Sequence, residues 1–124
     1  MPKETRRYRD GRGWEAKAGY SRAVRRGARI DVSGTTAADS SADTYGQTRA
    51  ALDQAIAAVE ALGGTKHEIL RTRIFLAPDA DWEAAARAHV QLLGDVAPAN
   101  TMLYAAGLIG DGYLVEVEVD AEVD

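Results

Sequence analysis

The feature that most constrains the fold is a strict alternation near the carboxyl end of the chain. Residues 115–120 read Val-Glu-Val-Glu-Val-Asp, so apolar and acidic side chains take turns. Successive side chains of a β-strand point to opposite faces of the sheet, so residues 113–120 are predicted to form a strand with one face in a core. The acidic face lies outside that core, and we therefore expect a sheet that other elements cover on one face only.

Two segments have the apolar spacing of helices. Residues 43–62 are rich in alanine, which favours a helix, and they end at Gly63-Gly64, which is typical of a helix C-terminus. Residues 82–93 follow aspartates that can cap a helix. The expected buried stripe of this second helix is Trp82, Ala86, Val90 and Leu93. These two helices are predicted to cover the apolar face of the sheet.

Short extended runs supply the remaining strands. They are expected at residues 20–24, 28–35, 68–77 and 101–106. The order of elements is then strand-strand-helix-strand-helix-strand-strand, and right-handed crossovers place both helices on the same face, which predicts an α+β fold. The open face would pair Arg71 or Arg73 with Glu116 or Glu118. A face of this mixed kind is usually covered by association, so we expect an oligomer.

The amino-terminal residues differ in character from the rest. Residues 1–13 are polar and basic and are expected to form an irregular arm ahead of a single domain, residues 14–124. Such an arm could bind phosphates. The net charge of −4 and the lack of aromatic residues interleaved with basic ones argue against a nucleic-acid partner. We expect the arm to be solvated or to pair with acidic residues of its own or a neighbouring chain.

Composition excludes several kinds of chemistry. The chain has no cysteine, which removes disulfides, thiolate nucleophiles and cysteine-ligated zinc. Its two histidines, His67 and His89, do not have the spacing of a metal site, so no metal is predicted. No apolar stretch approaches the ~20 residues that a bilayer requires, and the first residues lack the apolar core of a signal peptide. The sequence therefore predicts a cytoplasmic protein with no membrane partner.

Four short motifs in register resemble one known family. They are Tyr20-Ser21-Arg22-Ala23-Val24, Val32-Ser33-Gly34-Thr35, Pro98-Ala99-Asn100-Thr101-Met102 and Val115-Glu116-Val117-Glu118-Val119. In this order and at these intervals, and with a long helix that ends in Gly-Gly, they are similar to the Rid (reactive intermediate deaminase) proteins, also called the YjgF family. The resemblance extends over roughly residues 15–122.

The resemblance implies a fold, an assembly and an activity. The fold would be the chorismate-mutase-like α+β sheet with two helices on one face, and three chains would associate so that their sheets form a central barrel. Members of the family hydrolyse reactive 2-imino acids and their enamine tautomers to 2-keto acids and ammonia in clefts between subunits. The expectations for this chain are therefore a homotrimer, a small-molecule ligand, no metal and no organic cofactor.

Site residues carry over from the family one position at a time. Tyr20 matches a family tyrosine, Ser33 and Gly34 match a Ser-Gly pair at a strand end, and Glu116 matches a glutamate of the last strand. A carboxylate partly withdrawn from solvent can orient a water molecule and exchange its proton, so Glu116 is the catalytic candidate. The Tyr20 or Ser33 hydroxyl and a backbone N–H near Met102 would bind the ligand. A structural Glu116, paired with an arginine across the sheet, is equally compatible with the sequence.

Asn100 departs from the family pattern, because the deaminating members have an arginine after Pro-Ala. A guanidinium binds a carboxylate through two charged hydrogen bonds, which an amide cannot do. Another arginine (Arg22, Arg71 or Arg73) could replace it, the ligand could lack a carboxylate, or the cleft could bind without catalysing. The predicted ligand-binding residues are Tyr20, Ser33, Gly34, Asn100, Thr101 and Met102.

Two functions from different classes follow from these observations. The first is a Rid-like hydrolase or deaminase that acts on small reactive imines or enamines, with a substrate altered by Asn100. The second is a catalytically silent small-molecule-binding or regulatory trimer, which the missing arginine favours. RNA binding or cleavage is a third option, and the basic arm is its only support.

Overall fold

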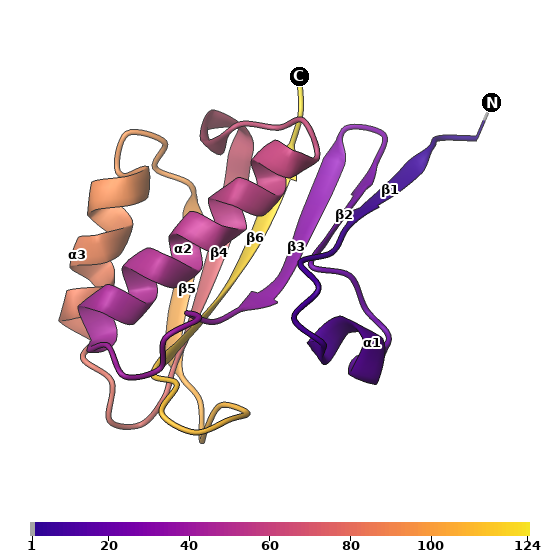
Figure 1. Ribbon diagram of the computed structural model, residues 1–124. Coiled ribbons are helices and arrows are strands. Elements are labelled where there is room, and N and C mark those ends of the chain that lie inside the picture. The colour runs from indigo at the N-terminus through magenta and orange to yellow at the C-terminus, as the bar shows by residue number, and fades with distance from the viewer. Residues whose placement is uncertain (1) are drawn as a thin grey trace.

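One mixed sheet organises residues 2–124, the part of the chain that the computed structural model describes (Figure 1). Its strands are β1 (Thr5–Tyr8), β2 (Ala23–Arg26), β3 (Arg29–Thr35), β4 (Ile69–Leu76), β5 (Ala99–Tyr104) and β6 (Val115–Glu122). Their spatial order is β1-β2-β3-β6-β4-β5. The β4–β5 pair is parallel, and the other pairs of neighbouring strands are antiparallel.

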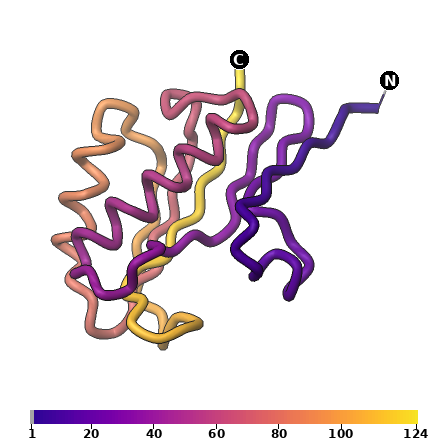
Figure 2. The backbone as a smooth tube through the Cα atoms, in the orientation of Figure 1, coloured from indigo at the N-terminus to yellow at the C-terminus, as the bar shows by residue number. Residues whose placement is uncertain are grey.

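Two long helices, α2 (Thr44–Ala61) and α3 (Trp82–Leu93), lie side by side on one face of the sheet (Figures 1 and 2). Asp43 caps α2 by accepting a hydrogen bond from the Gly46 N–H at 2.8 Å, and Asp81 caps α3 in the same way. The predicted helix spans and the predicted α+β class are confirmed. No helix within residues 2–124 has both the length and the apolar character needed to cross a membrane.

Two shorter elements complete the chain. A single 3₁₀ turn, η1 (Lys66–Glu68), leads into β4. A five-residue helix, α1 (Trp14–Ala18), lies apart from the long helices, near the end of the sheet at which β2 begins (Figure 1). Residues 105–114 form a loop between β5 and β6 at that same end of the molecule (Figure 2). These two segments are the ones that matter most for the candidate site.

The core lies between the sheet and the two long helices. Val115, Val117 and Val119 are fully buried there, and Glu116, Glu118 and Asp120 are half-buried on the opposite face. The alternation in β6 therefore separates a core face from an open face, as predicted. On the open face Arg73 Nη1 lies 3.1 Å from Asp120 Oδ2 and 3.9 Å from Glu118 Oε1. The expected pairing of Arg73 with Glu118 is present, but Asp120 is the closer partner.

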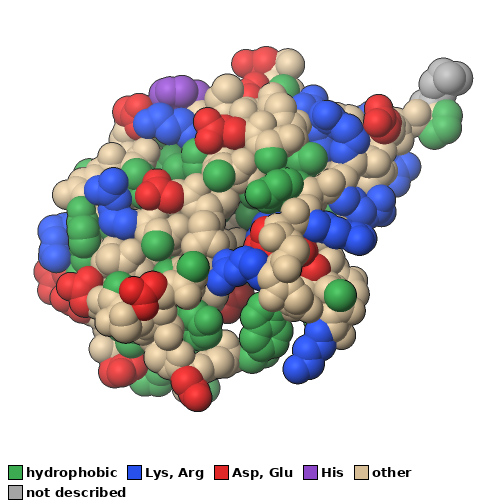
Figure 3. Space-filling model, viewed as in Figure 1, with side chains coloured by type: hydrophobic (Ala, Val, Ile, Leu, Met, Phe, Trp, Pro, Cys, Tyr) green, Lys and Arg blue, Asp and Glu red, His purple; other side chains and the backbone are tan. Residues whose placement is uncertain are grey.

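The amino-terminal arm corrects one expectation, because part of it is regular. Thr5–Tyr8 forms β1 and pairs with β2 over four residues, from Thr5 opposite Arg26 to Tyr8 opposite Ala23. The pairing satisfies backbone groups along β2 that would otherwise be a bare sheet edge, and Tyr8 packs against the core. Lys and Arg side chains consequently gather over β1 and β2, in blue on the right of Figure 3.

The buried face of α3 differs from the prediction, and the burial along β4 departs from a simple alternation. The buried face of α3 is made of Ala84, Ala85, Ala88 and Leu93, and Trp82 and Val90 are exposed instead. Small side chains let α3 approach α2 and the sheet closely, which turns the larger residues outward. In β4 a register shift between Ile69 and Arg71 leaves Ile69 buried and turns Leu70 to solvent, the reverse of the simple alternation.

Candidate functional site

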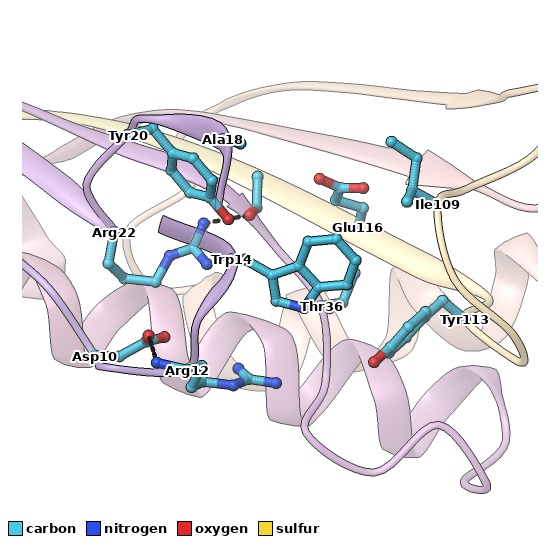
Figure 4. A pocket seen from close by; sticks show the side chains of 11 residues that line it. Asp10, Arg12, Trp14, Ala18, Tyr20, Arg22, Thr36, Ile109, Tyr113 and Glu116 are labelled. Atoms are coloured by element: carbon cyan, nitrogen blue, oxygen red, sulfur yellow. Dashed lines mark hydrogen bonds between the residues drawn. The ribbon is translucent and has the colours of Figure 1, made fainter. Parts of the chain in front are cut away.

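A cavity of about 240 Å³ opens between α1, the end of β3, the start of β6 and the 105–114 loop (Figure 4). Its walls combine charged, aromatic and apolar side chains. They are Asp10, Arg12, Trp14, Ala18, Tyr20, Arg22, Gly34, Thr36, Ile109, Tyr113 and Glu116. Concave sites that mix an apolar lining with a few converging polar groups are the usual form of small-molecule sites. We call this cavity the Glu116 pocket.

A buried carboxylate shapes the α1 side of the pocket. Glu15 accepts hydrogen bonds from three backbone N–H groups, those of Asp10 at 3.3 Å, Gly11 at 3.1 Å and Arg22 at 2.8 Å. Its side chain is almost fully buried, so these donors replace the water that a carboxylate otherwise requires. Glu15 thereby ties the arm to the start of β2 and holds Trp14 beside the cavity (Figure 4). We call this arrangement the Glu15 latch.

A buried amide shapes the opposite side of the pocket. Gln47 of α2 is fully buried and donates from Nε2 to the backbone carbonyls of Ser40, Ala42 and Gly112 at 3.1, 2.9 and 3.0 Å. Its Oε1 accepts from the Leu114 N–H at 2.9 Å. One side chain therefore fastens the 105–114 loop to the start of α2, which positions Tyr113 in the wall.

Gly34 and Glu116 fit together at the base of the pocket. The Glu116 carboxylate occupies the space that a β-carbon on residue 34 would need, so this position accommodates glycine and no larger residue without a shift. β3 can thus approach the Glu116 side chain of β6 this closely only because Gly34 has no side chain. The Ser-Gly motif and the glutamate of β6, which the sequence singled out separately, meet at this contact.

The electrostatic surroundings of Glu116 favour its protonated form. Burial raises the pKa of the Glu116 carboxyl above its ordinary value, and the nearby Glu118 carboxylate raises it further. The Arg22 guanidinium opposes both effects and lowers this pKa in part. Neither arginine of β4 forms a salt bridge with Glu116 in residues 2–124. Glu116 is therefore an ionisable group in the wall of a pocket, and no described residue forms an ion pair with it across the sheet.

Arg22 is the second charged group within the pocket. Its side chain is only 8% exposed, and Nη2 donates to the Gly34 carbonyl oxygen. The guanidinium carbon lies 5.5 Å from the centre of the Tyr20 ring, within the range of a cation–π contact. Nε is buried and has no hydrogen-bond partner in residues 2–124.

The predicted site residues fall into two groups. Tyr20, Gly34 and Glu116 line the same pocket. Ser33 is adjacent to them, but its Oγ donates to the Ser21 carbonyl oxygen at 2.6 Å and its N–H to the Arg22 carbonyl oxygen at 2.9 Å. The Ser33 hydroxyl proton is therefore used within the fold, where it fastens β3 to the segment that carries Tyr20.

The other three predicted residues lie on β5, two strands away from β6 in the sheet order. Asn100 and Met102 line a shallow groove beside Trp82 and Tyr104, whereas Thr101 lies on the other face of β5 and accepts a 3.4 Å hydrogen bond from Arg71 Nη1. Within one chain the structure does not bring these residues to Glu116.

The Asn100 side chain is oriented by a short hydrogen-bonded series. Asn100 Nδ2 lies 3.0 Å from Thr72 Oγ1, which is 2.8 Å from His89 Nε2. Burial lowers the pKa of His89 below its ordinary value, which favours the neutral imidazole in this contact. No arginine hydrogen-bonds to Asn100 in residues 2–124, so the clamp that the family places here has no substitute at this position.

Sequence reasoning did not identify several residues of the pocket, namely Asp10, Arg12, Trp14, Ala18, Thr36, Ile109 and Tyr113. The sequence indicates Arg22 only as one of three arginines that could replace the clamp. The described residues contain no group of three or more His, Cys, Asp or Glu side chains arranged to hold a metal ion.

The chain was compared with known proteins. A family model described as Endoribonuclease L-PSP matches residues 12–123. An uncharacterized Streptomyces coelicolor protein, SCO2049, is 39% identical over 121 residues, which cover 94% of this chain and 90% of that protein. The crystal structure of Rv2704 from Mycobacterium tuberculosis, a member of the YjgF/YER057c/UK114 family, is 36% identical with a TM-score of 0.91, and the match covers 97% of this chain and 100% of that one.

More distant structures share the fold. The YjgF gene product of E. coli is 24% identical, with a TM-score of 0.78 over 93% of this chain and 92% of that one. The sheet with two long helices on one face is thus common to both bacterial structures and to this chain.

Proposed function

Because the chain belongs to the YjgF family, which the Endoribonuclease L-PSP model describes, we propose that it is a hydrolase that deaminates small reactive imines or enamines in the Glu116 pocket. The single observation that carries the proposal is the Glu116–Gly34 contact. It places one carboxylate of raised pKa at the base of a metabolite-sized cavity. A carboxyl group whose pKa is raised by its surroundings is suited to exchange protons with a bound water molecule.

The proposed reaction uses Glu116 twice. As a base, the carboxylate accepts a proton from water while the water oxygen attacks the imine carbon; the C–O bond forms, and the C=N π electrons move to nitrogen, which takes up a proton from solvent. Glu116 then gives its proton to nitrogen as the C–N bond breaks and ammonia leaves, and the oxygen gives its remaining proton to solvent as the carbonyl forms. The net reaction converts an imine and water into a carbonyl compound and ammonia. An enamine enters as its imine tautomer, and the family resemblance implies no organic cofactor or metal for these steps.

The proposed assembly is a homotrimer with the site shared between neighbouring chains. In the isolated chain one strand, β4, lies between β6, which carries Glu116, and β5, which carries Asn100, Thr101 and Met102. Leu103 and Tyr104 on the same outer strand are exposed, as is Trp82 beside them. A second copy that packs against this apolar edge would bring β5 of one chain towards the pocket of another. The substrate selectivity would then depend on an amide where the family places a guanidinium.

The proposal is tested by following the release of keto acid and ammonia from freshly generated 2-aminoacrylate and from imines of other amino acids. Acceleration over buffer is expected, and the Glu116→Gln variant should lose it while it remains folded. Glu122→Gln is the matched control, because Glu122 lies on the same strand but is exposed and outside the pocket. Wild-type protein with no acceleration on any of these imines would remove this function from consideration.

The second candidate function is a ligand-binding module without catalysis. Asn100 favours it, because its amide is already engaged by Thr72 and offers a ligand no positive charge. Such a protein would be stabilised by metabolites through mass action. Thermal unfolding with 2-keto acids, run beside an assay of their consumption, separates the two functions: a raised Tm without turnover of any imine supports binding alone.

A further inference from the structure

Arg22 is a buried cation with unused hydrogen-bonding capacity. A guanidinium carries five N–H donors, and buried ones are normally paired with carboxylates or fully hydrogen-bonded. Arg22 forms no salt bridge in residues 2–124, its Nη2 is bound to a carbonyl oxygen, and its buried Nε has no partner. The structure thus holds a desolvated positive charge in a wall of the pocket without a neutralising group in contact with it.

The remaining walls are suited to a large apolar group. The rings of Trp14 and Tyr113 and the side chain of Ile109 also border the cavity; in Figure 4 Tyr113 and Ile109 lie on the side away from Arg22, and Trp14 lies between them and Arg22. Trp14 and Ile109 are both exposed to solvent in the chain. Large apolar side chains that gather exposed around a cavity usually mark a binding surface. A planar or branched apolar group would remove them from water.

Gly34 contacts both the Arg22 guanidinium and the Glu116 carboxylate. Its carbonyl oxygen accepts from Arg22 Nη2, and its α-carbon is covered by the Glu116 carboxylate. A group bound by Arg22 and a group facing Glu116 would therefore lie close together, because both of these side chains contact Gly34. In a 2-imino acid the carboxylate is bonded directly to the imine carbon, which matches this short separation.

We propose that Arg22 binds the carboxylate of the substrate and that Trp14, Tyr113 and Ile109 bind its side chain, so that the substrates are 2-imino acids with aromatic or large apolar side chains. This inference rests on the function proposed above and specifies its substrate class. A carboxylate fits better than a phosphate, because Asp10 and Glu116 also line the cavity and would repel a second negative charge. Arg22 thus takes the place of the missing clamp, from the segment just before β2.

Three stable probes test the inference by titration calorimetry on the full chain: 3-phenylpropionate, propionate and 3-phenylpropanol. The first has both the ring and the carboxylate, and each of the others has one of them. We expect 3-phenylpropionate to bind at least tenfold more tightly than either of the others. The Arg22→Gln variant should lose at least tenfold in affinity for 3-phenylpropionate and keep its affinity for 3-phenylpropanol. Arg26→Gln, an exposed position on β2, is the matched control and should bind like wild type.

A second variant covers the case in which Arg22→Gln does not fold. Trp14→Ala removes an exposed ring, and it should reduce the preference for 3-phenylpropionate over propionate at least fivefold. Equal affinities of the wild-type protein for the three probes, or tight binding that Arg22→Gln and Trp14→Ala leave unchanged, would overturn the inference. Probes that bind in the expected order to a protein without imine hydrolysis would refute the proposed catalysis and leave the Arg22 assignment standing.

Discussion

Replacing Gln47 with leucine tests whether one buried amide holds the pocket wall in place. Gln47→Leu keeps the approximate volume of the side chain but removes four hydrogen bonds, three donated to backbone carbonyls and one accepted from the Leu114 N–H. A hydrogen bond of this kind contributes about 1 kcal/mol net, and an unsatisfied buried partner adds to the loss, so we expect a cost of roughly 3–5 kcal/mol.

This loss is a large fraction of the free energy of unfolding of a typical domain, which is ~5–15 kcal/mol. At about 4 °C per kcal/mol for a chain of this size, Tm should fall by roughly 12–20 °C. Urea unfolding at a fixed protomer concentration measures the free energy directly. Gln54→Leu is the matched control on the same helix: Gln54 is half-buried, and its bonds to Thr36 and Arg12 are at the periphery, so its loss should cost less than about 1 kcal/mol. Equal costs for the two variants would refute the reasoning.

Four further predictions concern the pocket and the assembly. The rate of imine hydrolysis should rise with pH as Glu116 loses its proton. Glu118→Gln should move this rise to lower pH, because the Glu118 carboxylate is one cause of the raised pKa of Glu116. An identical pH–rate profile in the variant would contradict the role of Glu116 as the base. Because the folded-state pKa of Glu116 lies above the unfolded one, ionisation of this carboxyl opposes folding, and Glu116→Gln should leave Tm at neutral pH equal or higher; a lower Tm would show that the charge stabilises the fold. Gly34→Ala should displace the Glu116 carboxylate and lower activity at least tenfold, whereas Gly107→Ala, with no atom near its added β-carbon, should not; equal activities would argue against the contact. Sedimentation velocity should give a species of three chains, and a stable monomer would exclude the shared site.

The helices and the last strand could be predicted from the sequence because their determinants are local. Capping aspartates and alanine-rich spacing gave the spans of α2 and α3, and alternation gave the two faces of β6. The buried face of α3 could not be predicted, because it depends on how closely α2 packs against it. Trp82 and Val90 are exposed as a result of this packing, and the apolar spacing along one helix carries no information about it.

The candidate site could be predicted only in part, for a similar reason. The short motifs led to Tyr20, Gly34 and Glu116, which lie together. The position of Trp14 in the pocket wall depends on the Glu15 latch, whose three hydrogen bonds are local along the chain but follow no helix or strand period in the sequence. Arg22 has the appearance of one more basic residue in a basic stretch, and only its burial distinguishes it.

The Glu15 latch has a practical consequence for work with shortened chains. A protein that starts after residue 13 keeps the two long helices and strands β2 to β6, so circular dichroism would report most of the secondary structure of the whole chain. Glu15 would nevertheless lose two of the three backbone N–H donors that neutralise it, and the cavity would lose the Asp10 and Arg12 side chains. Ligand screens on trimmed material would thus sample a differently shaped opening from the one that the whole chain presents.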